Sequence, residues 1–291
     1  MYRSSPEPPA WTVGGRIGGI LICPHGQLAL SWSTAAAPHR RIGHAIEAHD
    51  AIGSTNDRAR EVLGEPGGSG RVILAELQTA GRGRRGRSWD SPAGINLTFS
   101  FGLRPRLAAG DAWLLAAAAG LAVRDAARPF GSLSLKWPND VVDADGRKVA
   151  GVLIETVIQD RRVAEAIIGI GVNVNWPRAE MPDELRRRAS SLAELAGQPI
   201  DRVDLLGRLL DELDAWMARA EAGGGILDAY RAASWLTGRT VEIEAGDRVL
   251  RGIAREVKPD GSLPIDAGGE PQAIAYGEVT RVLEPQPVTV S

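Results

Sequence analysis

The sequence VAGVLIETVIQDRRVAEAIIGIGVNV at residues 149–174 contains two long runs of β-branched and other apolar residues. The runs Val149–Ile158 and Val163–Val174 are separated only by the polar segment Gln159–Arg162. β-Branched residues favour strands, and a short polar connection between two such runs is typical of a hairpin. The stretch therefore predicts an antiparallel β-hairpin.

Helix signals lie on both sides of this hairpin. Ser54, followed three residues later by Asp57, is a helix-start signature that leads into a helix over 58–63. The Ala- and Leu-rich stretch 111–127 predicts a second helix. We expect further helices over 183–196, 201–220 and 226–235, and short strands over 46–49 and 72–77. This mixture of helices and strands indicates an α+β fold.

The sequence becomes rich in short strands after Thr237. Strands are predicted over 240–244, 249–257, 262–266, 272–276 and 278–283. Short strands in close succession are typical of a small β-barrel. We therefore divide the chain into an N-terminal extension (1–41), a main α+β domain (42–236), a small β domain (237–284) and a tail (285–291). Within the extension, the apolar runs Ile17–Ile22 and Leu28–Trp32 predict a hairpin or a disordered segment.

Composition excludes several classes of protein. The net charge is −2, from 34 basic and 36 acidic residues, so the whole chain carries no electrostatic signal for nucleic acid or an anionic membrane. Cys23 is the only cysteine, which excludes a disulfide framework and a thiolate metal cage. The longest apolar run, Ala112–Val123, is too short to span a bilayer. We predict a cytoplasmic protein that does not bind membranes.

The most unusual local feature is QTAGRGRRGRSW at residues 78–89, which follows a predicted strand. Its glycines permit close backbone approach, and its arginines can bind phosphate or carboxylate in a bidentate manner. Three interpretations stay open from this stretch alone. It is a solvated basic loop, a nucleic-acid contact with Trp89 as a stacking platform, or a mobile lid over a phosphorylated intermediate.

A second cluster, KWPND at 136–140, places a lysine, an amide and a carboxylate together at the end of a strand. Asn139 and Asp140 offer hard oxygen ligands for Mg²⁺, and Lys136 suits a phosphate. Lys148 lies at the start of the hairpin, and Gly151 permits a close approach of backbone or ligand. An ordinary proline-containing turn is the alternative explanation for KWPND.

In this order and spacing, these motifs resemble those of the biotin–protein ligases, monofunctional type. The resemblance rests on STN at 54–56, GRGRRGRSW at 81–89, KWPND, KVAGVLIE at 148–155 and GIGVNVN at 169–175, and it covers about residues 42–284. It implies a class II synthetase-like catalytic domain over 42–236, with a mixed, mainly antiparallel sheet flanked by helices, and an SH3-like barrel over 237–284. It also implies an enzyme that joins biotin to ATP and transfers the biotinyl group to a lysine of a biotin carboxyl carrier domain.

The resemblance further implies roles for individual residues. Catalytic roles fall to Lys148 and Arg84, and Asp140 is considered as the base of the transfer step. The implied biotin-binding residues are Ser54, Thr55, Asn56, Gln78, Arg82, Gly83, Arg84 and Lys148. The implied ATP-binding residues are Arg84, Arg85, Arg87, Trp89, Lys136, Asn139 and Asn173, with Asn139 and Asp140 as ligands of Mg²⁺.

Two alternatives and two further expectations complete the interpretation. Lipoyl or octanoyl ligases and transferases share this fold, but their RRxxGG run differs from Arg84-Arg85-Gly86-Arg87, which favours biotin. A non-enzymatic protein that binds RNA or DNA through its basic loop is the alternative from another class. Family members that act as repressors carry a winged helix, which residues 1–40 do not resemble, so we expect no nucleic-acid partner. A homodimer is a possible assembly.

Overall fold

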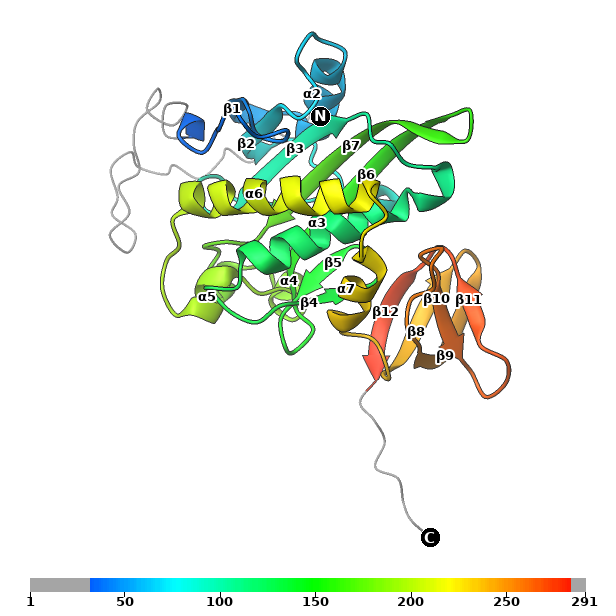
Figure 1. Ribbon diagram of the computed structural model, residues 1–291. Helices are drawn as coiled ribbons and strands as arrows, with labels where there is room; N and C mark the ends of the chain where they lie inside the picture. Colours follow the sequence, from blue (N-terminus) through cyan, green and yellow to red (C-terminus); the bar gives the residue numbers. More distant parts are fainter. Residues whose placement is uncertain (1–31, 284–291) are drawn as a thin grey trace, which may run out of the picture.

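The computed structural model describes residues 32–283, which form a seven-stranded sheet, a five-stranded sheet and the helices around them (Figure 1). The seven-stranded sheet has the order β1-β2-β3-β7-β6-β5-β4. Only β1 and β2 pair in parallel among these strands, so the sheet is mixed and mainly antiparallel, as predicted. Its strands are β1 (Ile46–Ile52), β2 (Val72–Gln78), β3 (Leu97–Leu103), β4 (Ser134–Lys136), β5 (Asp140–Val142), β6 (Lys148–Gln159) and β7 (Arg162–Val172).

The predicted hairpin is confirmed as the pair β6–β7 near the centre of the sheet. Asp160 and Arg161 form its turn, and both have positive φ values, 49° and 61°. Such values match the twist of the flanking strands in a two-residue turn. The register places Gly151 opposite Gly171. Two neighbouring strands therefore lack side chains at the same point on one face.

Helices cover both faces of the main sheet. Helix α3 (Trp113–Ala126) and helix α6 (Arg202–Glu221) lie side by side on one face (Figure 1). The alanines of α3 let the leucines of α6 approach closely, and both sets belong to the main apolar core. Helix α2 (Thr55–Leu63) packs on the opposite face through a separate apolar cluster that includes Ile73 and Ile167.

The predicted helix over 183–196 is wrong as a continuous element. The structure has helix α4 (Asp183–Arg186) and helix α5 (Leu192–Ala196), with residues 187–191 between them. This intervening segment pairs with the start of β6, because Lys148 N donates to Arg188 O at 2.7 Å and Ser190 N donates to Lys148 O at 3.0 Å. Hydrogen bonds to a strand replace those that would have continued the helix. Helix α7 (Ile226–Ala232) ends three residues earlier than predicted.

The C-terminal strands form a second antiparallel sheet of order β11-β10-β9-β8-β12. They are β8 (Thr240–Ala245), β9 (Arg248–Ala254), β10 (Leu263–Asp266), β11 (Gln272–Ile274) and β12 (Glu278–Leu283). No strand pairing joins β11 to β12 in residues 32–283, so the closed barrel is not confirmed. Trp113 Nε1 and Trp137 Nε1 donate to the backbone oxygens of Pro259 and Gly261, at 3.2 and 3.0 Å, and attach this sheet to the main one.

The last residues of the predicted N-terminal extension pack on the main core. The indole of Trp32 is 1% exposed and donates from Nε1 to Glu76 Oε1 at 3.1 Å. The predicted hairpin within residues 17–32 lies outside the described residues, except for Trp32 itself. No helix within residues 32–283 combines the length and apolar character needed to cross a membrane. The division of the chain into four segments stays a prediction.

Candidate active site

A pocket opens at the centre of the main sheet, between the N-terminal end of α2 and the middle of β3, β6 and β7. Its lining combines polar side chains from several elements with glycines and apolar residues of β6 and β7. The lining residues are Ser54, Thr55, Asn56, Gln78, Arg82, Gly83, Arg84, Trp89, Thr98, Phe99, Ser100, Asn139, Lys148, Gly151, Val152, Leu153, Gly169, Ile170 and Gly171. Four stretches that are far apart in sequence therefore meet at one site.

Residues 81–88, which we call the lid, fold over this pocket. The lid closes on itself, because Gly83 N donates to Arg87 O at 2.7 Å and Trp89 N donates to Gly81 O at 3.0 Å. Arg84 Nη1 donates to Asn139 Oδ1 at 3.2 Å, and burial lowers the pKa of the Arg84 guanidinium. An arginine stays protonated despite such a shift, so Arg84 carries a partly desolvated positive charge into the pocket.

The paired glycines of β6 and β7 provide a flat floor for the indole of Trp89. A Cβ atom at Gly171 would lie 2.3 Å from the Trp89 ring, and one at Gly151 would lie 3.1 Å from it. Trp89 Nε1 is buried and has no hydrogen-bond partner in the described structure. An unpaired buried donor carries a desolvation cost, so this N–H is suited to an acceptor atom of a ligand.

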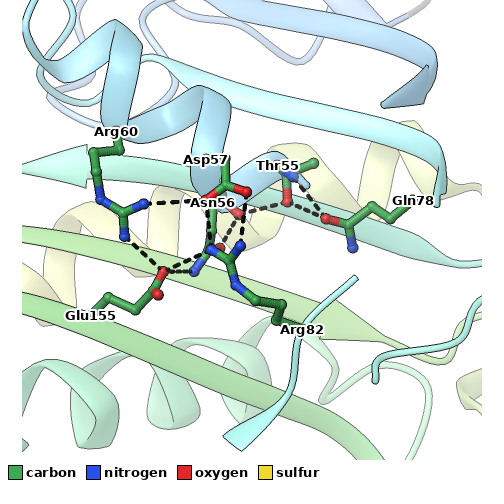
Figure 2. Close-up of polar contacts among 8 residues, drawn as sticks. Thr55, Asn56, Asp57, Arg60, Gln78, Arg82 and Glu155 are labelled. Atoms are coloured by element: carbon green, nitrogen blue, oxygen red, sulfur yellow. Dashed lines mark hydrogen bonds and ion pairs between the residues drawn. The ribbon is translucent and has the colours of Figure 1, made fainter. Parts of the chain in front are cut away.

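Hydrogen-bonded polar side chains form one wall of the pocket (Figure 2). Gln78 Oε1 accepts from Thr55 N and Oγ1 at 2.8 and 2.9 Å. Thr55 Oγ1 lies 2.7 Å from Ser100 Oγ, and Ser100 Oγ donates to Asn56 Oδ1 at 2.6 Å. Asn56 Nδ2 then donates to Glu155 Oε2 at 2.7 Å. The buried hydroxyls and amides of this wall are thereby fixed in orientation.

Gly169 makes room for this wall, since a Cβ atom there would lie 2.3 Å from Asn56 Oδ1. We expect Gly169→Ala to lower the free energy of unfolding by roughly 1–3 kcal/mol, because an overpacked buried site must shift its neighbours. Urea unfolding measures the change. Gly53→Ala is the matched control, because a Cβ atom at Gly53 meets nothing within 4 Å. Equal stabilities of the two variants would contradict the steric argument.

Charged residues hold the first half of the lid against α2 (Figure 2). Arg82 Nη1 and Nη2 donate to the two carboxylate oxygens of Asp57 at 2.8 and 2.7 Å. Arg82 Nη2 and Arg60 Nη2 also lie 3.5 and 3.1 Å from Glu155 Oε2. The hydrogen bonds from Arg82 lower the pKa of Asp57. In this structure the Arg82 guanidinium pairs with Asp57, and its predicted role in binding biotin stays a prediction.

Three charged groups lie beside the lid at the ends of β4, β5 and β6. Lys148 Nζ is 2.7 Å from Asp140 Oδ1 and 5.3 Å from the centre of the Trp89 ring. Lys136 is half-buried, and burial lowers the pKa of its ammonium group, although the Asp140 carboxylate acts in the opposite direction. The Lys148 ammonium group, which lies against both a carboxylate and an aromatic face, is therefore well placed to bind an anionic ligand.

The structure brings ten of the predicted site residues together and places five outside the pocket lining. The ten are Ser54, Thr55, Asn56, Gln78, Arg82, Gly83, Arg84, Trp89, Asn139 and Lys148. Asp140 contacts the site through its ion pair with Lys148, and Lys136 interacts electrostatically with both of these groups. Arg85 and Arg87 point to the C-terminal sheet, where they pair with Glu278. Asn173 Nδ2 donates to Lys148 O at 3.3 Å and Ser190 O at 3.1 Å, so it fixes backbone.

Sequence reasoning missed Ser100, Thr98 and Glu155. Thr98 and Ser100 lie two residues apart on the buried strand β3, so their hydroxyls face the same side of the sheet. Two hydroxyls on one face of a buried strand are a sequence signal of a polar site. Glu155 lies within the KVAGVLIE motif, but its bonds to Asn56 and Arg60 depend on the position of α2. Its role could therefore not be predicted from spacing.

Comparisons with known proteins identify related sequences and structures. Residues 49–173 match the model of the biotin/lipoate A/B protein ligase family. The biotin–[acetyl-CoA-carboxylase] ligase of Mycobacterium tuberculosis is 38% identical over 221 residues, which cover 73% of this chain and 79% of that protein. The bifunctional ligase/repressor BirA of Bacillus subtilis is 34% identical over 67% of this chain, and the match spans 60% of BirA.

A solved structure extends the similarity to the fold. The biotin protein ligase of Aquifex aeolicus in complex with biotin and ATP superimposes with a TM-score of 0.69 and 29% identity, over 80% of this chain and 97% of that one. Similarity of sequence and of fold thus point to the same group of enzymes. The chain belongs to the biotin/lipoate A/B protein ligase family.

Proposed function

We propose that this protein is an ATP-dependent biotin–protein ligase. The observation that carries the proposal is the convergence of the half-buried Arg84 guanidinium and the Lys148 ammonium group on one pocket beneath the lid. The relative from M. tuberculosis is named as a biotin–[acetyl-CoA-carboxylase] ligase, and the A. aeolicus structure contains biotin and ATP. Both support biotin and ATP as the two small-molecule substrates of this chain.

In the first step, a carboxylate oxygen of biotin attacks the α-phosphorus of ATP, the bond to the β-phosphate oxygen breaks, and pyrophosphate leaves. The step brings two anions together, so catalysis consists mainly of charge neutralisation and positioning. We assign Lys148 and Arg84 to the carboxylate and the α-phosphate. Trp89 lies on the glycine floor beside them, where its indole can pack against the adenine or the biotin ring.

The polar wall is the proposed site for the ureido group of biotin. That group presents two N–H donors and a carbonyl acceptor. Ser54 is the N-cap residue of α2, but its hydroxyl makes no capping hydrogen bond and lines the pocket. Thr55 and Gln78 lie next to it in the same wall. These side chains supply acceptors and donors in one place, and a ligand without matching groups would leave them unpaired.

Magnesium belongs to the proposal as a companion of ATP, and Asp140 is the residue best suited to it. Mg²⁺ commonly uses one or two carboxylates, with phosphate oxygens and water completing its coordination. The Asp140 carboxylate, whose Oδ1 pairs with Lys148, would be the protein ligand of the ion. Asn139 fits less well, because its Oδ1 accepts from Arg84 and its Nδ2 donates to Val152 O. Within residues 32–283, His, Asp and Glu side chains form no metal-binding group of three or more.

In the second step, the lysine amine of a biotin carboxyl carrier domain attacks the acyl carbon of biotinyl-5′-AMP. AMP leaves, and the amine loses a proton, for which Asp140 is the proposed acceptor. The adenylate reacts with water, so a closed lid protects it until the carrier domain arrives. The carrier domain, the homodimer, the cytoplasmic location and the absence of a nucleic-acid partner stay predictions.

Exchange of labelled pyrophosphate into ATP tests the proposed activity. In the presence of Mg²⁺ and ATP, we expect exchange that depends on added biotin, because only a reversible adenylation returns pyrophosphate to ATP. Exchange that depends on lipoate instead would reassign the enzyme to the lipoyl ligases. No exchange with either acid, together with oligonucleotide binding that weakens with salt, would replace the proposal by a nucleic-acid-binding role.

A further inference from the structure

The tip of the lid turns its arginine side chains in two directions. Arg84–Gly86 form a single 3₁₀ turn in which Arg85 has a φ of 57° and Gly86 a φ of 73°. A left-handed conformation at a residue other than glycine costs energy, so it persists where contacts hold it. Arg84 enters the pocket, while Arg85 and Arg87 extend towards the C-terminal sheet.

Glu278, the first residue of β12, pairs with both Arg85 and Arg87, which we call the outer arginines. Arg87 Nη1 donates to Glu278 Oε1, and Arg85 Nη1 lies 3.7 Å from Glu278 Oε2. Arg85 Nη1 also lies 3.8 Å from Glu244 Oε2 on β8. The Glu278 side chain is only 26% exposed, whereas Arg87 is 59% exposed. The carboxylate is thus the more buried partner of the contact.

The register of the C-terminal sheet gives these contacts an energetic reason. Glu278 and Glu244 are directly opposite each other on the antiparallel strands β12 and β8. Like charges at opposite positions of neighbouring strands destabilise a sheet. The guanidinium groups of Arg85 and Arg87 offset this repulsion when the lid is closed. An open lid would leave the two carboxylates facing each other without these cations.

We infer that Glu278 is a positioning residue that holds the lid closed through its ion pairs with Arg85 and Arg87, and we call these contacts the latch. The C-terminal sheet thereby takes part in retaining the intermediate, although Glu278 is absent from the pocket lining. The inference deepens the proposed function and rests on it for the identity of the intermediate. The latch itself is a property of the ligand-free protein and can be measured without any substrate.

Site-resolved trypsin cleavage of the ligand-free full chain tests the latch. Cleavage after Arg85 and Arg87, quantified by mass spectrometry, is expected to be about three- to tenfold faster in Glu278→Gln, since a partly exposed ion-pair cluster contributes only this much. Glu242→Gln is the matched control, because Glu242 lies on the same strand as Glu244 and pairs with Arg281 of β12 instead of the lid. Lid cleavage of Glu278→Gln at the wild-type rate would overturn the inference.

A charge reversal separates the latch from a general loss of stability. Glu278→Arg is expected to expose the lid further, and adding Arg87→Glu is expected to return cleavage after Arg84 to within about twofold of wild type. A double variant that is cleaved as fast as Glu278→Arg would overturn the latch.

In the enzyme assay, Glu278→Gln should release more free adenylate than wild type, while its rate of pyrophosphate exchange stays within about twofold of wild type.

The two proposals fail in different experiments. Wild-type protein without biotin-dependent exchange would overturn the proposed function, and the cleavage rates would still decide the latch. Wild-type exchange together with equal adenylate release from Glu278→Gln and Glu242→Gln would overturn the role of Glu278 in retention.

Discussion

Lys148→Ala is expected to reduce biotin-dependent pyrophosphate exchange by at least about 10²- to 10³-fold, because a positioned charge that stabilises a reaction's developing negative charge has an effect of this size. Lys148 Nζ pairs with Asp140 and lies over Trp89, so it enters the pocket in a fixed orientation. Its backbone is held on both sides by residues 188–190. The ammonium group, and not the local fold, is therefore what the substitution removes.

Lys258→Ala is the control for this experiment. Only three lysines occur in the sequence, and Lys258 lies on an exposed turn of the C-terminal unit, where its backbone N donates to Ser262 O at 2.9 Å. It should exchange pyrophosphate at the wild-type rate. Far-ultraviolet circular dichroism of both variants should match the parent. Wild-type exchange in a folded Lys148→Ala protein would remove Lys148 from the proposed mechanism.

Lys148→Arg separates charge from shape at the same position. The lysine chain end lies against Gly151, where an added Cβ atom would meet Lys148 Cε and Nζ at 2.8 Å. A planar guanidinium is larger than an ammonium group and differs in its hydrogen-bond directions. We expect Lys148→Arg to restore little of the pyrophosphate exchange that is lost in Lys148→Ala. That result would show that the position requires a compact cation.

Patterns of local sequence were sufficient to predict most of the fold. The β6–β7 hairpin was predicted because its two runs and their connection lie within a single stretch of chain. The predicted helix over 183–196 was wrong because residues 187–191 pair with β6, and a sequence pattern carries no information on such a distant partner. The predicted barrel likewise depended on a contact between β11 and β12, which are at the two edges of the C-terminal sheet.

In the candidate site, too, the identities of residues could be predicted from local sequence, whereas their contacts could not. Motifs predict ten of the residues that line the pocket, but not Thr98 and Ser100, and the contacts of all of them follow from tertiary structure. Arg82 pairs with Asp57 because α2 packs beside the lid, and Arg87 reaches Glu278 because the C-terminal sheet lies against it. Ion pairs between residues 25 and 191 positions apart have no local signature. Motif spacing therefore identified the chemistry, while the positioning contacts required coordinates.

Arg84→Gly is expected to leave adenylate formation measurable but to speed release of the intermediate by roughly 10- to 100-fold. Charge-assisted hydrogen bonds contribute about 1.5–3 kcal/mol, and each 1.4 kcal/mol corresponds to a factor of ten. Arg84 lines the pocket and contacts Asn139, whereas Arg82, the other lid arginine in the lining, pairs with Asp57. Without it, the lid loses the contact of Arg84 with Asn139 but keeps the bonds of Arg82, Arg85 and Arg87 to α2 and the C-terminal sheet.

Release of the intermediate should be detectable as biotinylation of proteins that the enzyme does not recognise, because free biotinyl-5′-AMP acylates exposed lysines. The chain itself has only three lysines, so an added lysine-rich bystander protein is needed, probed with labelled streptavidin. Arg104→Gly is the matched control, since Arg104 pairs with Glu165 at 2.9 Å and does not line the pocket. Equal labelling of the bystander by both variants would mean that the lid retains the adenylate without the Arg84 side chain, and the retention role would then pass to the outer arginines and Glu278.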